Sequence, residues 1–498
     1  MRRLGEAIQE WVKNTPDNPA ISDADHAFSY RALDQAMAEC RELLRSYGLT
    51  AGDRIALIGE NSTTLAIFIL SAGLDDIWVV LENARRAPLE TDAVCEHAQP
   101  KRIFYLTENS PSALGHAERH HAKPASASFG SFYVGQELNS VPEECFESAK
   151  DQVAALIYTT GSTGIPKGVM LTHANLLYIG NQMKKHRQMA PKDRVYGVLS
   201  ITHVMGLASG LAGTLVSGAH IRLVPRFSDA DCVKSLINEG ITVLQGAPAM
   251  FSKLANSTDM KDCRPTSLRF IAAGGAPLDP SVKQHVEDCF GLILHNGYGL
   301  TEGAAICWTR LDDRNADCTV GPPNCDIEIK ILDDERNPVR EGERGSLWAK
   351  GPNIMKGYFR DAEKTATVLM ADGWMNTEDL ASRLPDGRVV IGGRSKDLII
   401  RSGFNVSPLE VETAINAHPS VQNCAVLGQK IDGNEEVVAF IELCPGAELS
   451  CDDVTVFLKD RLSPYKRPTR IHFIDSLPTA PNGKILKQKV RQILEEQL

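Results

Sequence analysis

The 498-residue sequence predicts an α/β protein. We expect a large N-terminal domain of parallel-type sheets covered by helices, a β-rich subdomain within it, and a small α+β domain at the C-terminus. Between residues 54 and 296, short apolar segments alternate with helical patterns, as in parallel sheets that carry helices on their faces. Between residues 319 and 393, short strand patterns are separated by Gly-containing turns. A chain of this length exceeds the usual size of one hydrophobic core, so two or more domains are expected.

The α/β region contains apolar segments that we expect to form strands, at 54–59, 77–81, 102–106, 154–158, 195–200, 220–224, 241–246 and 268–275. We expect an amphipathic helix over 62–73 and a further helix around 279–290. The stretch 195–221 has no Asp, Glu, Lys or Arg, but its glycines and hydroxyls favour a buried strand followed by a small-residue helix over a membrane span. The segment 109–150 gives no clear pattern.

The last hundred or so residues contain both the helical and the strand spacing of apolar residues. Ser407, Pro408 and Glu410 predict a helix start in which Ser407 caps the helix and Glu410 reaches back to it. Strands are expected at 424–428 and 437–443. Helices are expected around 454–461 and 490–494 from their apolar spacing.

Composition restricts the classes of function. The net charge is −10 and the pI is about 5.8, which argues against a general binder of nucleic acid or of an anionic membrane. The 12 cysteines form no CxxC pair, so neither a zinc site nor a disulfide framework is indicated. The N-terminal segment has no apolar run, so we expect a cytoplasmic protein without integral membrane association.

The segment "YTTGSTGIPKG", residues 158–168, has the composition of an anion-binding loop. Glycines allow backbone N–H groups to turn toward one point, and a lysine adds positive charge. The loop is not the common nucleotide-binding P-loop, because that pattern places Gly directly before Lys. A surface turn is the plainer alternative. The residues concerned are Thr159, Thr160, Gly161, Ser162, Thr163, Gly164 and Lys167.

This segment closely resembles the signature loop of the adenylate-forming superfamily, which includes acyl-CoA synthetases, adenylation domains and luciferases. The resemblance extends from about residue 31 to residue 487, with four more motifs in the order of that family. It implies that the loop wraps the β- and γ-phosphates of ATP.

The second motif, "YGLTE" at 298–302, resembles the adenine and metal segment of the family. The resemblance implies that Tyr298 packs on adenine, Thr301 contacts the α-phosphate and Glu302 ligates Mg²⁺. An aromatic face and a hard carboxylate oxygen suit these roles. The glycines here also mimic a dinucleotide fingerprint, but with one residue too many. The nucleotide-binding segments further include Asn296, Gly297 and Gly299, and, from "AAGGAPL", Gly275, Ala276 and Pro277. Taken alone, the last three equally fit a strand-to-helix turn.

Two further segments resemble the ribose site and the domain junction of the family. In "GWMNTEDLA", Asp379 is expected to bind the ribose hydroxyls, although Glu378 replaces the usual glycine. In "GGRSKDLIIRSGFNVSPLEVE", Arg394 is expected to contact the nucleotide. The resemblance also implies a hinge near Lys396 and a thiol-tunnel stretch at Gly403. The large domain would then span 1–394 and a small mobile domain 395–498.

The last motif, "LPTAPNGKILK", contains Lys484. The resemblance implies that this lysine contacts the acyl carboxylate and the α-phosphate region. His203, in "SITHVMGL", matches the position of an aromatic residue or histidine beside the acyl pocket, although a histidine in an apolar stretch is more often a core residue. We therefore assign candidate catalytic roles to Lys484, Thr301, Glu302 and His203.

The leading interpretation is an ATP-dependent acid–thiol ligase that uses ATP, Mg²⁺ and coenzyme A. The apolar residues around His203 favour an aliphatic or aromatic acid, and the absence of an acidic residue there disfavours an amino acid. Basic residues at 459–470 and 484–491 fit either a phosphorylated thiol or ordinary solvated helix faces. The alternatives are transfer to a carrier-protein phosphopantetheine, a luciferase-like oxygenase, and a non-catalytic nucleotide-binding relative. We expect a monomer or homodimer.

Overall fold

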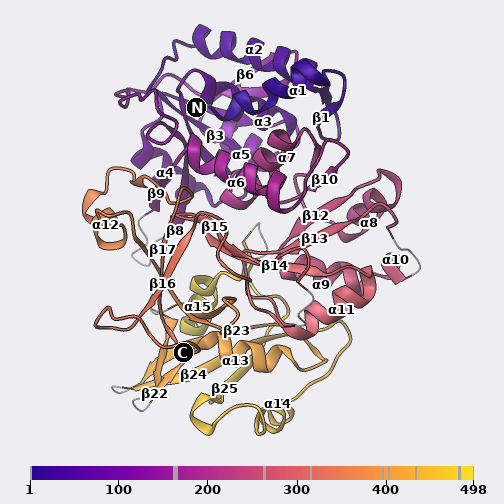
Figure 1. The fold of residues 1–498 in the computed structure, drawn as a ribbon, viewed down its shortest axis with the longest axis vertical. Helices are drawn as coiled ribbons and strands as arrows, with labels where there is room; N and C mark the ends of the chain where they lie inside the picture. Colours follow the sequence, from indigo (N-terminus) through magenta and orange to yellow (C-terminus); the bar gives the residue numbers. More distant parts are fainter. Residues whose placement is uncertain are drawn as a thin grey trace.

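In the computed structural model, two eight-stranded sheets form the centre of the large N-terminal part of the chain (Figure 1). The structure describes residues 3–160, 166–261, 265–313, 317–394, 397–401, 404–431, 434–480 and 484–496. The N-terminus lies at the top of Figure 1 and the C-terminus in the lower part.

The first sheet is parallel in its centre and antiparallel at both edges. Its strand order is β15 (Ala304–Trp308), β14 (Leu294–Leu300), β13 (Phe270–Ala273), β12 (Val243–Gly246), β10 (Arg194–Gly197), β11 (His220–Leu223), β1 (Pro19–Ser22) and β2 (Ala27–Ser29). The second sheet also has a parallel centre. Its order is β18 (Gly357–Tyr358), β9 (Pro166–Thr172), β8 (Val153–Thr160), β4 (Trp78–Asn83), β3 (Arg54–Gly59), β5 (Arg102–Leu106), β7 (Gly130–Val134) and β6 (Lys123–Ala127).

Helices form three layers around these sheets. One apolar cluster joins residues of both sheets with η1 (Leu4–Ile8), α1 (Gln9–Asn14), α2 (Tyr30–Ser46), α3 (Thr63–Leu74), α6 (His173–His186), the π-helix η2 (Met205–Ala212) and α7 (Gly213–Ser217). A second cluster places α8 (Asp229–Asn238), α9 (Pro248–Asn256), α10 (Thr258–Lys261) and α11 (Pro280–Phe290) on the other face of the first sheet. A third places α4 (Pro88–Ala98) and α5 (Pro111–Arg119) on the other face of the second sheet. Helices thus cover both faces of each sheet, as predicted for this fold class.

The β-rich subdomain is a four-stranded antiparallel sheet. Its strands are β16 (Glu328–Leu332), β17 (Gly345–Lys350), β19 (Met375–Arg383) and β20 (Val389–Arg394), and α12 (Ala362–Val368) lies between β18 and β19 in the chain. The strand β20 ends at residue 394. The boundary between 394 and 395 and the hinge near Lys396 remain predictions, because residues 395–396 lie outside the described part of the chain.

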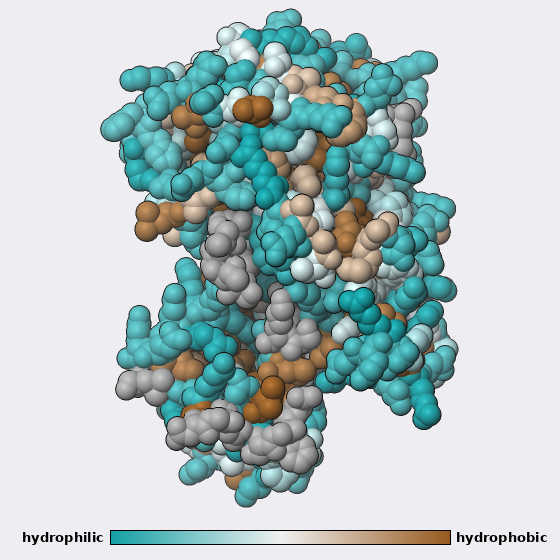
Figure 2. Space-filling view, turned by 90° about the vertical axis from the view of Figure 1, so that its left-hand side faces the viewer, coloured by the Kyte–Doolittle hydropathy of each residue, from teal (hydrophilic) through white to brown (hydrophobic). Residues whose placement is uncertain are grey.

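The small C-terminal part packs three helices around a short sheet, in the lower half of Figure 1. Its elements are the hairpin β21 (Ile399–Arg401) and β22 (Phe404–Val406), α13 (Pro408–Asn416), β23 (Val421–Ile431), β24 (Asn434–Leu443), α14 (Cys451–Leu458), η4 (Pro464–Lys466), β25 (Arg470–Phe473) and α15 (Lys487–Glu496). The fold class is confirmed. Figure 2 shows a largely hydrophilic surface whose outline narrows above this part.

Two local predictions are wrong in detail. The helix α3 is not amphipathic, because it lies between the sheets and buries all of its residues except Leu74. Helix α13 starts at Pro408 as predicted, but Ser407 makes no side-chain cap. Its Oγ donates instead to the carbonyl oxygen of Gly392 at 2.9 Å, so this hydroxyl ties the start of α13 to β20. Among the described residues, no helix is both long and apolar enough to cross a membrane.

Candidate active site

The glycine-rich loop joins the hairpin strands β8 and β9. The register pairs Thr159 with Lys167 and Thr160 with Pro166, so residues 161–165 connect two antiparallel strands. Gly161, Ser162, Thr163 and Gly164 lie outside the described residues. A P-loop leads from a strand into a helix. The hairpin therefore excludes the P-loop arrangement by its topology.

Tyr158, shortly before this loop, is held by a residue that follows the neighbouring strand β4. Arg86, beyond the end of β4, donates from Nη2 to the carbonyl oxygen of Tyr158 at 3.1 Å. The same arginine contacts Glu82 at 3.2 Å, and burial raises the pKa of Glu82 to about 7. The Tyr158 hydroxyl lies 2.8 Å from Nδ1 of His97. A Cβ on Gly168 would lie 2.9 Å from the Tyr158 ring, so this close packing requires a glycine. Tyr158 is thus fixed at both its carbonyl and its hydroxyl.

Glu302 and Lys167 meet at one aromatic residue, Tyr358. The Tyr358 hydroxyl donates to Glu302 Oε1 at 2.8 Å, and Lys167 Nζ lies 5.6 Å from the centroid of the Tyr358 ring. The backbone N–H of Met355 donates to the Glu302 carbonyl oxygen at 2.8 Å. The predicted metal ligand and the predicted phosphate-loop lysine are therefore neighbours. Sequence reasoning missed Tyr358, because nothing in "KGYFR" distinguishes it from an ordinary buried tyrosine.

Tyr298 and Asp379 form a direct hydrogen bond. The Tyr298 hydroxyl donates to Asp379 Oδ2 at 2.5 Å, and Asp379 is buried. Burial, followed by the Asp379 charge, raises the pKa of Tyr298. Asp379 in β19 is also the cross-strand partner of Arg394 in β20. The predicted adenine and ribose residues therefore lie together, and the backbone of Arg394 is beside them.

Glu378 adopts the conformation that a glycine would favour. Its φ is +61°, in the left-handed region, which costs a residue with a side chain about 1–2 kcal/mol. Its N–H donates to Asn376 Oδ1 at 2.9 Å, and Lys364 lies 3.7 Å from its carboxylate. The replacement of the usual glycine therefore leaves the turn before Asp379 intact.

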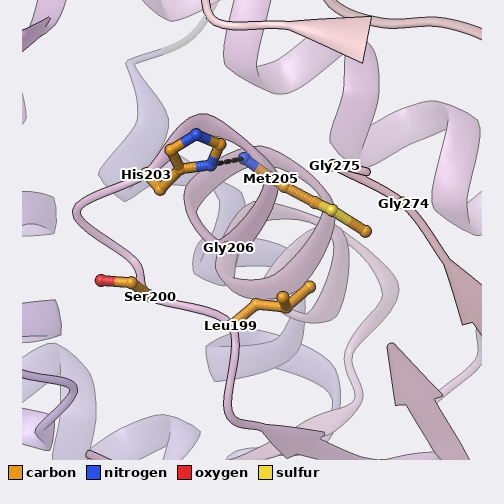
Figure 3. A pocket seen from close by; sticks show the side chains of 7 residues that line it. All are labelled: Leu199, Ser200, His203, Met205, Gly206, Gly274 and Gly275. Carbon is orange, nitrogen blue, oxygen red and sulfur yellow. Dashed lines mark hydrogen bonds between the residues drawn. The ribbon is translucent and has the colours of Figure 1, made fainter. Parts of the chain in front are cut away.

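His203 lines a small apolar cavity at the start of the π-helix η2 (Figure 3). The cavity has a volume of about 10 Å³ and is lined by Leu199, Ser200, His203, Met205, Gly206, Gly274 and Gly275. Figure 3 shows the Met205 side chain extended toward Gly274. A Cβ on Gly274 would lie 2.9 Å from Met205 Cε, so the thioether fills the space that the glycine leaves. Met205 therefore limits the size of the cavity.

The predicted catalytic lysine lies near this cavity. Burial, together with the positive charge of Lys484, lowers the pKa of His203 to about 4. Lys484 is exposed, and its carbonyl oxygen accepts from the N–H of Ala480 at 2.7 Å. The backbone N–H of Met205 donates to Nδ1 of His203 at 3.4 Å. His203 is therefore neutral at pH 7, with Nδ1 as the acceptor and its proton on Nε2.

The remaining predicted residues lie near the cavity at His203 or in the β14–β15 hairpin. Gly275, with φ of +78°, lines the cavity, and Ala276 and Pro277 follow it in the turn between β13 and α11. Gly274 also lies near the Gly297 carbonyl oxygen, since a Cβ there would be 3.9 Å from it. A Cβ on Gly299 would overlap the Ala304 carbonyl oxygen, so that glycine is required by the β14–β15 hairpin. Thr301 is buried in the turn of this hairpin, a topology that excludes the dinucleotide fingerprint.

Asn296 differs from the other predicted nucleotide contacts. Its amide Nδ2 donates to the carbonyl oxygens of Cys318 and Thr319, at 3.0 and 3.3 Å. Its Oδ1 accepts from the N–H of Gly297 at 3.0 Å. These bonds brace the strand that carries Tyr298. Lys396 and Gly403 lie outside the described residues, as does the side chain of Arg394.

Comparison with known proteins gives a consistent result. A family model described as AMP-binding enzyme matches residues 8–359, and a second, described as AMP-binding enzyme C-terminal domain, matches residues 410–484. A feruloyl-CoA synthase from Amycolatopsis is 31% identical over 98% of this chain and 98% of its own length. The ATP-bound structure of MatB from Rhodopseudomonas palustris superposes with a TM-score of 0.87 at 26% identity, covering 99% of each chain. The apo structure of MatB gives a TM-score of 0.76 at 27% identity, again over 99% of each chain.

The electrostatics of His203 predict a distinctive pH dependence. The folded-state pKa of about 4 lies below the ordinary value of 6.5, so the unfolded chain binds a proton more readily than the native one. The stability that His203 contributes is therefore present above pH 6.5 and is lost as the pH falls through 4. Titration of histidine Cε1 resonances, assigned by comparison with His203→Asn, should show no protonation of this ring above pH 5.5. A midpoint near 6.5 would contradict the burial and the proximity of Lys484.

Proposed function

The chain belongs to the family of AMP-binding enzymes and is an acid–CoA ligase, and we propose that its acid is an apolar aliphatic or aromatic carboxylic acid activated through an acyl-adenylate. The observation that carries this proposal is the convergence of Lys484 and the apolar cavity at His203. The Tyr298–Asp379 pair joins the β14–β15 hairpin to β19, and the Glu302–Tyr358–Lys167 cluster joins the same hairpin to β18 and β9.

In the first half-reaction, a carboxylate oxygen attacks the α-phosphorus of ATP. The new bond joins that oxygen to phosphorus, while the bond to the bridging oxygen breaks and pyrophosphate leaves with its electron pair. Both reactants are anionic, so catalysis depends on in-line positioning and on cations near the phosphates. Lys484 is proposed to approach the carboxylate and α-phosphate, and Lys167 the departing phosphates. Asp379 is proposed to hold the ribose hydroxyls, with Tyr298 against the adenine.

The donors present fit a magnesium ion. Mg²⁺ is commonly held by one or two carboxylates together with substrate phosphates. Glu302 supplies a carboxylate beside Lys167, and Tyr358 orients it through Oε1. When bound there with ATP, the ion would neutralise phosphate charge. Thr301, buried in the same turn, is proposed to contact the α-phosphate.

The second half-reaction transfers the acyl group to sulfur. The thiolate of coenzyme A attacks the acyl carbon, the carbon–oxygen bond to phosphate breaks, and AMP leaves. Many basic side chains of the C-terminal part already have partners. Lys466 lies 2.5 Å from Glu410, and Lys487 lies 2.7 Å from Glu412. The basic residues at 459–470 are thus partly structural, so they give weak support for a phosphate site.

The lining of the cavity supports the proposed class of acid. Among the described residues, its lining consists of glycines, Leu199, Met205, Ser200 and His203, and the imidazole of His203 is neutral at pH 7. An apolar lining of this kind favours an apolar tail over a second carboxylate. The cavity of about 10 Å³ holds no more than about one water-sized group while Met205 occupies it. An aromatic acid therefore requires Met205 to move.

Pyrophosphate exchange tests this function directly. Purified protein should incorporate labelled pyrophosphate into ATP only in the presence of an accepted acid. A panel should include short and medium straight-chain acids, benzoate, ferulate and a dicarboxylate such as succinate. We expect exchange with monocarboxylates of one apolar class, and release of AMP on addition of coenzyme A. Exchange restricted to the dicarboxylate would contradict the proposed acid, and silence across the panel from folded, ATP-binding protein would contradict ligase activity.

Replacement of Lys484 should separate the half-reactions. In Lys484→Ala, we expect pyrophosphate exchange to fall by about 100-fold or more, because a positioned cation is lost from the transition state. Thioester formation from supplied acyl-adenylate should stay within about threefold of wild type. Lys489→Ala, on the exposed face of α15, is the control and should leave both rates unchanged. Equal loss of both half-reactions in Lys484→Ala would rule out the assigned role.

Met205 should control the size of the acid. In Met205→Ala, we expect kcat/KM for the bulkiest accepted acid to rise by about tenfold relative to the smallest, because removed side-chain volume is worth a few kcal/mol in an apolar pocket. KM for ATP should stay constant. Ratios of kcat/KM across the same panel measure the effect. A uniform fall for all acids would indicate that Met205 only packs against Gly274.

A further inference from the structure

Three loops from different strands converge behind the cavity at His203. The first follows β3 and carries Asn61, the second ends β4 at Asn83, and the third is the segment 197–203 that leads from β10 to η2. Because β3 and β4 belong to one large sheet and β10 to the other, the wall of the cavity is assembled across the seam between the two sheets.

Asn61 occupies the centre of this seam. It is 2% exposed. Its Nδ2 donates to the carbonyl oxygens of Gly197, Leu199 and Val224, at 2.9, 3.0 and 3.1 Å. Its Oδ1 accepts from the N–H of Ile201 at 2.9 Å. One side chain therefore satisfies four backbone groups, three of them in the segment that ends at His203.

Asn83 holds the same segment from the next strand. Its Nδ2 donates to Ser200 Oγ at 3.2 Å, and Ser200 Oγ lies 2.8 Å from Thr202 Oγ1. The Ser200 carbonyl oxygen then accepts from the N–H of His203 at 3.0 Å. Leu199 and Ser200, which Figure 3 shows in the cavity wall, are thus held by Asn61 and Asn83 respectively.

We propose that Asn61 is a positioning residue for the acid pocket: it fixes segment 197–203, and through it His203, from the opposite sheet. This inference rests on the proposed function, since the cavity at His203 is taken as the acid site. Asn61 itself does not line the cavity.

The chemistry of the site requires an amide. A carboxylate at position 61 could still accept from Ile201, but it would face three carbonyl oxygens without a proton to donate. The Gly197 carbonyl oxygen would keep the N–H of Val224 at 3.0 Å, but those of Leu199 and Val224 would lose the amide donor. Buried acceptors left without donors each carry a desolvation cost. Asn61→Asp should therefore release the segment from the seam, although Asp and Asn have nearly the same shape.

The test measures the acid site and the nucleotide site separately in Asn61→Asp. With the acid that gives the fastest pyrophosphate exchange in wild type, we expect KM for the acid to rise by about tenfold or more, since several hydrogen bonds to the segment are lost. The Kd for Mg-ATP should change by less than about threefold, because Tyr158, Tyr298 and Asp379 are held by other contacts. Equal weakening of both sites, or an unchanged KM for the acid, would overturn the proposal.

A second readout does not depend on the acid. Carbethoxylation of His203 by diethyl pyrocarbonate, followed by peptide mapping, should be about threefold or more faster in Asn61→Asp, because a released segment exposes the ring more often. An unchanged rate would overturn the proposal. If none of the acids in the panel supports pyrophosphate exchange by the wild type, the proposed function fails. The rate of His203 labelling and the Kd for Mg-ATP then still decide the role of Asn61.

The matched control is Asn175→Asp. Asn175 is also buried, and its Nδ2 donates to the carbonyl oxygens of Pro352 and Ile354 at 2.8 and 2.9 Å, away from segment 197–203. This variant should lower Tm without accelerating His203 labelling. Asn61→Ala, which removes the donors without burying a charge, replaces Asn61→Asp if the latter does not fold. Failure of both Asn61 variants to fold, with Asn175→Asp folded, would make the residue purely structural and overturn the proposal.

Discussion

The hydrogen bond between Tyr298 and Asp379 is the constraint on which the candidate site depends. Tyr298 belongs to the β14–β15 hairpin at one edge of the first large sheet, and Asp379 belongs to β19 of the β-rich subdomain. A buried carboxylate is stable only when it is paired or hydrogen-bonded, and a buried phenol likewise needs a partner. The phenol donates the hydrogen bond that the carboxylate needs, so this contact links the first large sheet to the β-rich subdomain. The hydrogen bonds of Asn296 fix the strand that carries Tyr298, and the hydrogen bond of the Glu378 N–H fixes the turn before Asp379.

A second constraint is the negative net charge, which makes the placement of basic side chains near the candidate site important. The chain carries a net charge of −10, so a triphosphate approaches an unfavourable average field, and binding depends on a local excess of positive charge. The described basic residues differ in what they contact. Arg86 contacts Glu82 and donates to the backbone of Tyr158, and Lys466 and Lys487 are paired with carboxylates of the C-terminal part. Lys167 lies over the ring of Tyr358, and the charge of Lys484 acts on the imidazole of His203.

Sequence reasoning predicted the elements that depend on local patterns. The strands at 54–59 and 102–106 are almost wholly buried, and the strand at 220–223 alternates half-buried with buried residues. The alternation of strand and helix patterns predicted the parallel centre of both sheets. It failed where tertiary position overrode local chemistry. Ser407 has the pattern of a capping residue but bonds to Gly392, because β20 lies close enough to compete. The helix α3 was expected to show a polar face, but layers on both sides bury its Thr and Ser residues. Tyr358 and Asn61 were not found, since each acts on residues more than fifty positions away and leaves no local periodic signal.

The placement of Lys484 links geometry to the order of the two half-reactions. The whole chain superposes better on ATP-bound MatB than on its apo form, and in this arrangement the Lys484 charge reaches the imidazole of His203. A cation at that point favours approach of a carboxylate to phosphate, but it would also stand where a thiol must reach the acyl carbon once the adenylate has formed. The mixed anhydride must survive until then in a site that excludes water. The Tyr298–Asp379 and Asn61 contacts join residues of 1–394 alone, so they do not depend on the position of Lys484. The proposed function therefore draws on two parts of the chain: contacts within residues 1–394 shape the proposed nucleotide site and acid pocket, and the proposed catalytic lysine, Lys484, comes from the C-terminal part.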